Sequence, residues 1–213
     1  MVAPASLELS RATILGHRLQ VGQLVDRLDC GRQSLRRAAA AGSEEVHHRD
    51  LGGSQVSALW KKGRGKLGPL APLIGSWIAE SDSPMGPLHC TRRLTLALGG
   101  KYLLLDVHWQ FGPGAEGKSY EEHAVISAGD DGALAFWSFT SDGKRSEGRL
   151  ADVTDVHPEA VGFEAQMPAG LARMVYWPAD DGGFHWAVES KTKKGWNRFV
   201  DHHYRPADAP AAA

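Results

Sequence analysis

The chain has 213 residues, 42% of them hydrophobic, and a formal net charge of -1, which are values of a globular protein long enough to bury a core. Its two cysteines, Cys30 and Cys90, exclude a disulfide framework, and no apolar run approaches the ~20 residues of a membrane-spanning helix. Residues 1–11 lack the charged and apolar regions of a secretory signal peptide. We therefore expect a cytoplasmic protein that does not enter membranes.

Residues 1–67 are predicted to form a helical and linker extension before the main domain. They carry 11 Lys and Arg residues against 6 Asp and Glu, whereas the rest of the chain is acidic. Apolar side chains fall on one face of a helix over 10–29, and an alanine-rich stretch predicts a second helix over 33–41. The polar, glycine-rich stretch that follows is typical of a linker.

The basic front segment raises the question of a nucleic-acid partner. Residues 9–11 and 17–20 resemble the opening helix of bacterial winged-helix DNA-binding proteins related to a DNA glycosylase family. Nothing after Cys30 supplies the recognition helix or wing that reading a groove requires. We therefore do not expect nucleic-acid binding, and a remnant, a wrongly assigned start or a docking helix are the alternatives for this segment.

Residues 68–207 are predicted to form a β-barrel, followed by a disordered tail over 208–213. Short runs rich in Val, Leu, Tyr, Phe and Trp are separated by glycine-containing turn sequences. Gly99 and Gly100 predict a two-residue hairpin turn, because both central positions of a type I′ turn require positive φ. The predicted strands are 77–81, 88–98, 101–111, 118–128, 133–139, 144–153, 160–166, 171–177, 184–190 and 196–204.

Ten strands with short connections are expected to pair antiparallel in chain order. Such a sheet hides its edges by closing into a barrel or by splitting into a sandwich, and the even spacing without a long crossover favours the barrel. The expected fold class is therefore all-β, a ten-stranded antiparallel up-and-down barrel preceded by a short helical, partly disordered N-terminal segment. A barrel of this size is wide enough to enclose a small ligand.

Residues 72–77, Pro-Leu-Ile-Gly-Ser-Trp, resemble the Gly-x-Trp opening of the calycin superfamily. The turn and aromatic rhythm of 99–143 is similar to that of its small bacterial lipocalin-like members, which have a fatty-acid-binding-protein-like barrel and mostly no assigned activity. This resemblance implies a calycin-like barrel. A more distant similarity, of 69–77 to nitrobindin-like haem proteins, implies as an alternative that haem binds through His203 and acts on reactive nitrogen species.

The candidate ligand-binding residues suit a mostly apolar cavity with a few polar anchors. Tryptophans lie on six predicted strands, and we favour Trp137 and Trp186 as cavity wall. An inward guanidinium at Arg92 or Arg173 can hold a ligand carboxylate in a bidentate pair; the alternative is that each faces solvent or pairs with a strand neighbour. Histidines are further possible anchors, although most are expected to be exposed or hydrogen-bonded wall residues. The full set is Trp77, Arg92, His123, Trp137, Arg173, Trp186 and His203.

Motifs for catalysis are not found in the sequence. It contains no Gly-x-Ser-x-Gly, no phosphate loop, no Cys-x-x-Cys and no His-x-His. We therefore expect a barrel that binds a small apolar or amphipathic ligand, with no catalytic residues, metal or cofactor. The alternatives are the haem protein described above and a solid barrel whose front helix docks a partner. Neither the ligand nor the oligomeric state is set by the sequence.

Overall fold

The computed structural model describes residues 60–83, 86–112 and 117–207. The helices predicted over 10–29 and 33–41, and the tail predicted over 208–213, lie outside the described residues. Within the described residues a single 3-10 helix, η1 (Gly68–Leu73), is followed by ten strands. These are β1 (Gly75–Ser83), β2 (Gly86–Ala97), β3 (Tyr102–Phe111), β4 (Lys118–Ala128), β5 (Leu134–Thr140), β6 (Arg145–Ala151), β7 (Val161–Met167), β8 (Gly170–Pro178), β9 (Phe184–Thr192) and β10 (Gly195–Pro206).

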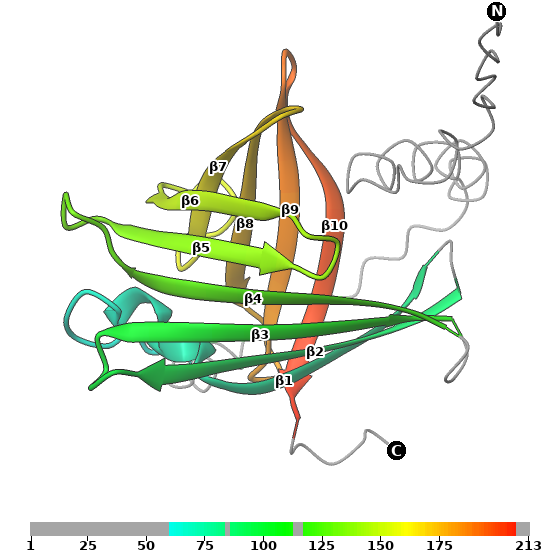
Figure 1. Cartoon of the computed structure of the whole chain (residues 1–213), viewed down its shortest axis with the longest axis horizontal. Coiled ribbons are helices and arrows are strands. Elements are labelled where there is room, and N and C mark those ends of the chain that lie inside the picture. The colour runs from blue at the N-terminus through cyan, green and yellow to red at the C-terminus, as the bar shows by residue number, and fades with distance from the viewer. Residues whose placement is uncertain (1–59, 84–85, 113–116, 208–213) are drawn as a thin grey trace, which may run out of the picture. The chain divides into compact units, whose positions relative to one another are not determined.

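The ten strands close into an antiparallel barrel in which each strand pairs with the next in the chain. Closure is completed between β1 and β10, where Trp77 lies opposite Pro206 and Ile78 opposite Arg205. In Figure 1 the first strands run across the page and β8 to β10 run up it, so the two walls of the barrel cross at a large angle. The predicted all-β, up-and-down, ten-stranded barrel is confirmed.

One end of the barrel is closed by η1 and the residues before it (Figure 1). Leu70 and Leu73 are each only 1% exposed and belong to the main core. The indole nitrogen of Trp77, at the start of β1, donates a hydrogen bond to the Leu73 carbonyl at 2.8 Å. Trp60 is also buried, and its indole donates to the Glu159 carbonyl at 3.0 Å. The packed part of the chain therefore begins before residue 68.

The connection between β2 and β3 differs from the predicted two-residue turn. β2 ends at Ala97 and β3 begins at Tyr102, so four residues form the connection. Leu98, Gly99 and Gly100 all have positive φ, of 50°, 69° and 76°. The left-handed conformation thus starts one residue earlier than the glycine pair, at a leucine that is 75% exposed.

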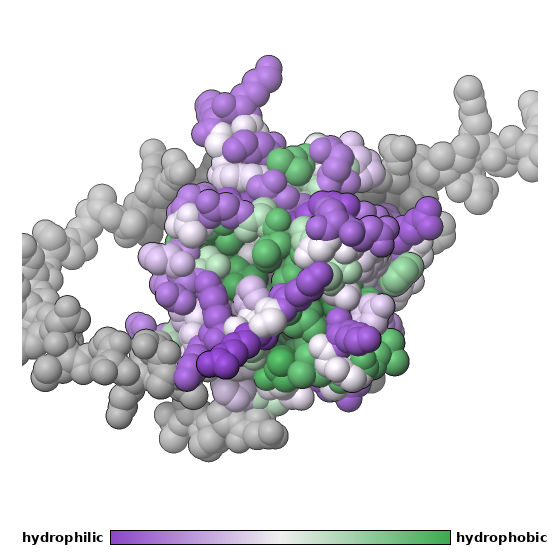
Figure 2. Space-filling model, turned by 90° about the vertical axis from the view of Figure 1, so that its left-hand side faces the viewer, coloured by the Kyte–Doolittle hydropathy of each residue, from purple (hydrophilic) through white to green (hydrophobic). Residues whose placement is uncertain are grey.

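The surface at the end of the barrel that carries η1 is partly apolar. Figure 2 shows apolar side chains gathered in the middle and lower part of this face, with hydrophilic side chains around them. Exposed apolar residues in the segments at this end are Ile74, Leu96 and Leu98. A hollow of about 300 Å³ lies here, and its lining includes Trp60, Pro72 and Trp77.

Candidate functional site

β2 carries Arg92 into the barrel because its side chains alternate between the two faces. Every second residue from Leu88 to Leu94 is buried, and Arg93 between them is exposed. Arg92 is 1% exposed, although a guanidinium stays charged at any ordinary pH. A buried cation is costly unless it is paired, so its surroundings decide what the interior can bind.

Four aromatic rings surround the Arg92 guanidinium, one each from β3, β8, β9 and β10. Its central carbon lies 3.8 Å from the ring centroid of Trp186 and 5.1 Å from that of Tyr204. The rings of Trp109 and Tyr176 are each at 5.8 Å. The electron-rich faces of these rings stabilise a buried cation, which explains why a charge is tolerated here without a carboxylate in contact.

The aromatic shell leaves several hydrogen-bond donors unused. The Arg92 Nη1 donates to the Tyr176 hydroxyl at 3.0 Å. Among the described residues, its Nε and Nη2 have no acceptor in hydrogen-bonding geometry, and neither do the indole nitrogens of Trp109 and Trp186. Each buried donor left without a partner costs about 1–3 kcal/mol. Two such donors in the guanidinium and two in the indoles beside it form a site that favours a hydrogen-bond acceptor, and above all an anion.

Beside the Arg92 guanidinium, Cys90 and Tyr204 form a buried polar contact. The Tyr204 hydroxyl donates to the Cys90 sulfur at 3.1 Å, and both residues are 0% exposed. Burial raises the pKa of the Cys90 thiol and of the Tyr204 hydroxyl, while the charge of Arg92 opposes both shifts. Both groups are therefore neutral at pH 7 and add no charge to the site.

His202 on β10 also faces the interior. Its ring lies parallel to that of Trp186 at 6.1 Å and edge-on to that of Trp109 at 5.5 Å. Its Nδ1 is 3.3 Å from the hydroxyl oxygen of Ser81 on β1. Burial, and then the positive charge of Arg92, lower the pKa of His202 to about 4. The imidazole is therefore neutral at pH 7.

The inward-facing residues near the end opposite η1 are apolar and only partly buried. They pack against the main core, and they are Phe111, Tyr120, Met167, Met174, Val188 and Val200. We call this end of the barrel the rim. A hollow of about 510 Å³ beside it is lined mainly by polar residues on the outer face of β1–β3, among them Glu80, Asp82 and His89, together with Ser81 and Leu88. The apolar surface at the rim is therefore that of the six partly buried inward residues named above.

The structure places Arg92 and Trp186 next to each other inside the barrel; the sequence named both as candidates for the interior but did not predict their contact. Trp77 faces inward at the closed end, where its ring packs edge-on against Phe184 at 4.9 Å. It is therefore part of the closure of the barrel and lies away from the rim. The register places Trp77 directly opposite Arg92 on the neighbouring strand.

The inward orientation expected of the other four candidates is wrong. On β4, His123 has a 73% exposed side chain and lies 2.5 Å from the Asp106 carboxylate on the outer wall. On β5, Phe136 and Ser138 are buried in the interior, so Trp137 between them faces outward. His203 lies outside too, with its Nε2 3.1 Å from Asp181.

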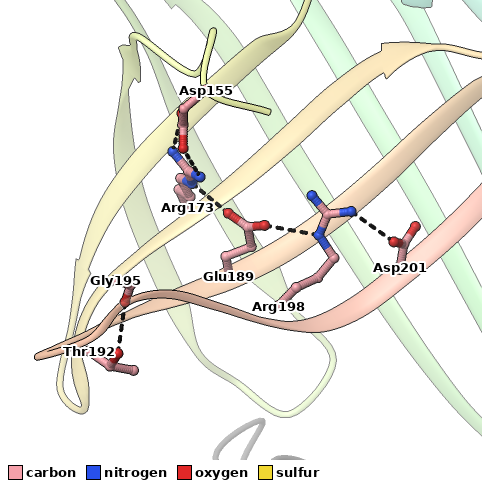
Figure 3. Close-up of polar contacts among 7 residues, drawn as sticks. All are labelled: Asp155, Arg173, Glu189, Thr192, Gly195, Arg198 and Asp201. Atoms are coloured by element: carbon pink, nitrogen blue, oxygen red, sulfur yellow. Dashed lines mark hydrogen bonds and ion pairs between the residues drawn. The ribbon is translucent and has the colours of Figure 1, made fainter. Parts of the chain in front are cut away.

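Arg173 is buried, but on the outside of the barrel (Figure 3). It makes two hydrogen bonds of 2.7 and 2.8 Å to Asp155, in the connection between β6 and β7, and one of 2.6 Å to Glu189. Glu189 in turn accepts from Arg198 at 2.9 Å, and Arg198 donates to Asp201 at 3.0 Å. The guanidinium of Arg173 is thus paired with two carboxylates, one of them on the neighbouring strand, in agreement with the alternative interpretation.

Sequence reasoning missed most of the residues that complete the interior site. They are Cys90, Trp109, Tyr176, His202 and Tyr204 around Arg92, and Glu122 on β4 with Ser138, whose hydroxyl donates to its carboxylate. Glu122 had a usable signal, because Ala124 and Ile126, on the same face of the strand, are apolar, whereas Glu121 shares its face with His123. The aromatic residues could be placed on strands from the sequence, but not on a face.

The described residues do not fit a haem held by His203. That side chain is 44% exposed on the outer wall and is paired with Asp181. The neighbouring His202 does face the interior, but its ring is packed between two indoles. Within the described residues, no group of three His, Cys, Asp or Glu side chains is arranged to hold a metal ion.

Comparisons with known proteins give little further guidance. No family model matches the chain, and no curated protein matches it. Among solved structures it is similar to a chain described as a de novo design of a fluorescence-activating β-barrel. The two are 19% identical with a TM-score of 0.32, over 48% of this chain and 88% of the designed one. A TM-score this low does not define a shared fold, and the fold described above rests on the strand pairing alone. None of the helical segments that the structure describes has the length and apolar character of a bilayer-spanning helix.

Proposed function

We propose that this protein binds a small amphipathic molecule inside its barrel, with an anionic head at Arg92 and an apolar tail toward the rim. One observation carries the proposal: within the described residues, two N–H groups of the buried Arg92 guanidinium and the indole N–H groups of Trp109 and Trp186 beside it have no acceptor in hydrogen-bonding geometry. An anion in their midst would supply the missing acceptor and neutralise the charge. Membership of the calycin superfamily and a binding role without a cofactor are part of the same proposal.

The apolar half of the proposed ligand rests on the rim. The inward side chains there include two methionines, which adapt their shape to a bound molecule, together with valines and aromatic rings. A ligand tail that covers them removes apolar surface from water, at about 25 cal/mol per Å². Head and tail are therefore expected to contribute separately to affinity.

The experiment is a fluorescence titration of the full chain with 11-(dansylamino)undecanoic acid, followed by competition with dodecanoate and dodecanol. Arg92→Met is the test variant, and Arg93→Met is its matched control, because Arg93 is the next residue on β2 and faces outward. We expect Arg92→Met to weaken binding at least about tenfold, since a hydrogen bond to a charged group contributes about 1.5–3 kcal/mol. Arg93→Met should bind as the parent protein does.

A second variant guards against the possibility that Arg92→Met does not fold. Trp186→Phe removes one of the four N–H donors but keeps an aromatic ring under the guanidinium. It should weaken binding of the probe about threefold to tenfold. Equal affinity in the parent and both interior variants, or equal competition by dodecanoate and dodecanol, would overturn the proposal.

A further inference from the structure

A second charged side chain faces the interior of the barrel. Glu122 on β4 is partly buried, and its Oε1 accepts a hydrogen bond of 2.5 Å from the hydroxyl of Ser138 on β5. Ser138 is 1% exposed, so its hydroxyl fixes one carboxylate oxygen against the wall. Among the described residues, Glu122 makes no ion pair.

The strand register places Glu122 in the same row as Arg92. Val107 on β3 lies opposite Arg92 on one side and opposite Glu122 on the other. Two strand spacings put the two backbones about 10 Å apart. The carboxylate contributes to the electrostatic potential at Arg92, but it does not accept its free N–H groups. The interior thus holds a positively and a negatively charged side chain, a positive and a negative pole, in one row of the sheet without a hydrogen bond between them.

Aromatic rings lie next to the negative pole. In the row beside Glu122, toward the rim, Trp109 lies directly opposite Tyr120. Phe111 stacks on Trp109 with ring centroids 6.3 Å apart and planes 7° apart. Aromatic faces attract quaternary ammonium groups, and a carboxylate beside them adds a charge of the opposite sign.

From these two poles we infer that the head of the ligand is a zwitterion. Its anionic group accepts from Arg92 and from the indoles of Trp109 and Trp186, and its ammonium group faces Glu122. The apolar tail runs toward the rim. This inference rests on the proposed function and narrows it, since a simple anion would satisfy Arg92 but would be repelled by Glu122.

The test compares three amphiphiles of one chain length by isothermal titration calorimetry, below their micelle concentrations. They are dodecanoate, dodecyltrimethylammonium and the zwitterion N-dodecyl-N,N-dimethylglycine. We expect the full-length protein to bind the zwitterion at least about tenfold more tightly than dodecanoate, as expected for one further charge-assisted contact. The cation should bind most weakly of the three.

Glu122→Gln is the test variant, and Glu121→Gln is the matched control one residue away on the outer face. The first should bring the affinity for the zwitterion down to that for dodecanoate, and the second should leave the preference unchanged. If Glu122→Gln does not fold, Ser138→Ala replaces it and should lower the preference about threefold, because it frees the carboxylate from the wall.

The outcomes separate this inference from the proposed function. The inference of a zwitterionic head is wrong if dodecanoate and the zwitterion bind the parent protein with equal affinity. It is also wrong if the preference for the zwitterion survives Glu122→Gln or, where that variant does not fold, Ser138→Ala. In either case the proposed ligand-binding function still stands. If none of the three amphiphiles binds, the proposed function itself fails and the inference falls with it.

Discussion

Among the groups through which acid should destabilise this protein, His202 has the clearest effect, because it is the histidine whose pKa is lowered furthest. In the folded state burial and the charge of Arg92 lower its pKa to about 4, whereas an exposed histidine titrates near 6.5. Between these values the unfolded chain binds a proton that the folded chain does not. The free energy of unfolding therefore has its full value above about pH 6.5 and falls as the pH is lowered toward 4.

The magnitude follows from the size of the shift. A difference of about 2.5 pKa units at about 1.4 kcal/mol per unit sets a ceiling of roughly 3 kcal/mol. The ring is not fully enclosed, and pH 4.5 still lies above the pKa of the folded state, so we expect roughly 2 kcal/mol between pH 7 and pH 4.5. That is a large part of the stability of an ordinary domain.

Urea unfolding of the full chain at pH 7 and at pH 4.5 measures this loss. His202→Gln cannot take up the proton, so its stability should fall by roughly 2 kcal/mol less than that of the parent over the same interval. His203→Gln is the control, because it removes an exposed neighbour on the same strand, and it should fall as much as the parent does. If His202→Gln and the parent lose stability in parallel, the assignment of a buried, neutral His202 is wrong.

Three further substitutions test the packing. Gly148→Ala should lower stability by about 1–3 kcal/mol in urea unfolding, because the added Cβ would collide with the ring of Phe136 inside the barrel; an unchanged midpoint would mean that the two strands can move apart. Glu189→Gln should cost roughly 3 kcal/mol, since it leaves Arg173 buried with one carboxylate fewer, and a loss under 1 kcal/mol would show that Asp155 alone suffices. Trp60→Ala should lower the free energy of unfolding by about 3 kcal/mol, measured by thermal unfolding. A chain shortened to begin at residue 66 should be destabilised equally, and full stability of that chain would contradict the packing of this indole.

Much of the fold could be predicted from local patterns. Alternation and turn residues located all ten strands, and their short connections implied antiparallel pairing in chain order. Strand ends were less well predicted, because β10 continues past its predicted end, and the two added residues, Arg205 and Pro206, are the ones that pair with β1. That pairing joins the two ends of the sheet, and no local signal reports it.

The candidate site was predicted only in part, because alternation says which residues share a face but not which face lies inside. On β8, the neighbours of Arg173 are apolar on both faces of the strand, so the pattern does not show which face lies inside. Arg173 lies on the outer face, and it is buried there because the β6–β7 connection, which carries Asp155, packs over it. On β10 the register shifts between Arg198 and Val200. A bulge of this kind turns every later side chain to the opposite face, so His203, expected inside, lies outside.

The sequence by itself thus determined an all-β chain of ten short strands, because a two-residue period and glycine turns are local properties that need no tertiary contact. It also showed that a charged residue, Arg92, lies among alternating apolar residues, where its guanidinium has to be solvated, paired or packed on aromatic rings. The tertiary structure alone decided that four rings from four other strands meet around Arg92 and that Glu122 lies two strands away without touching it. Strand register and barrel closure set those distances, and both depend on pairings between residues far apart in the chain.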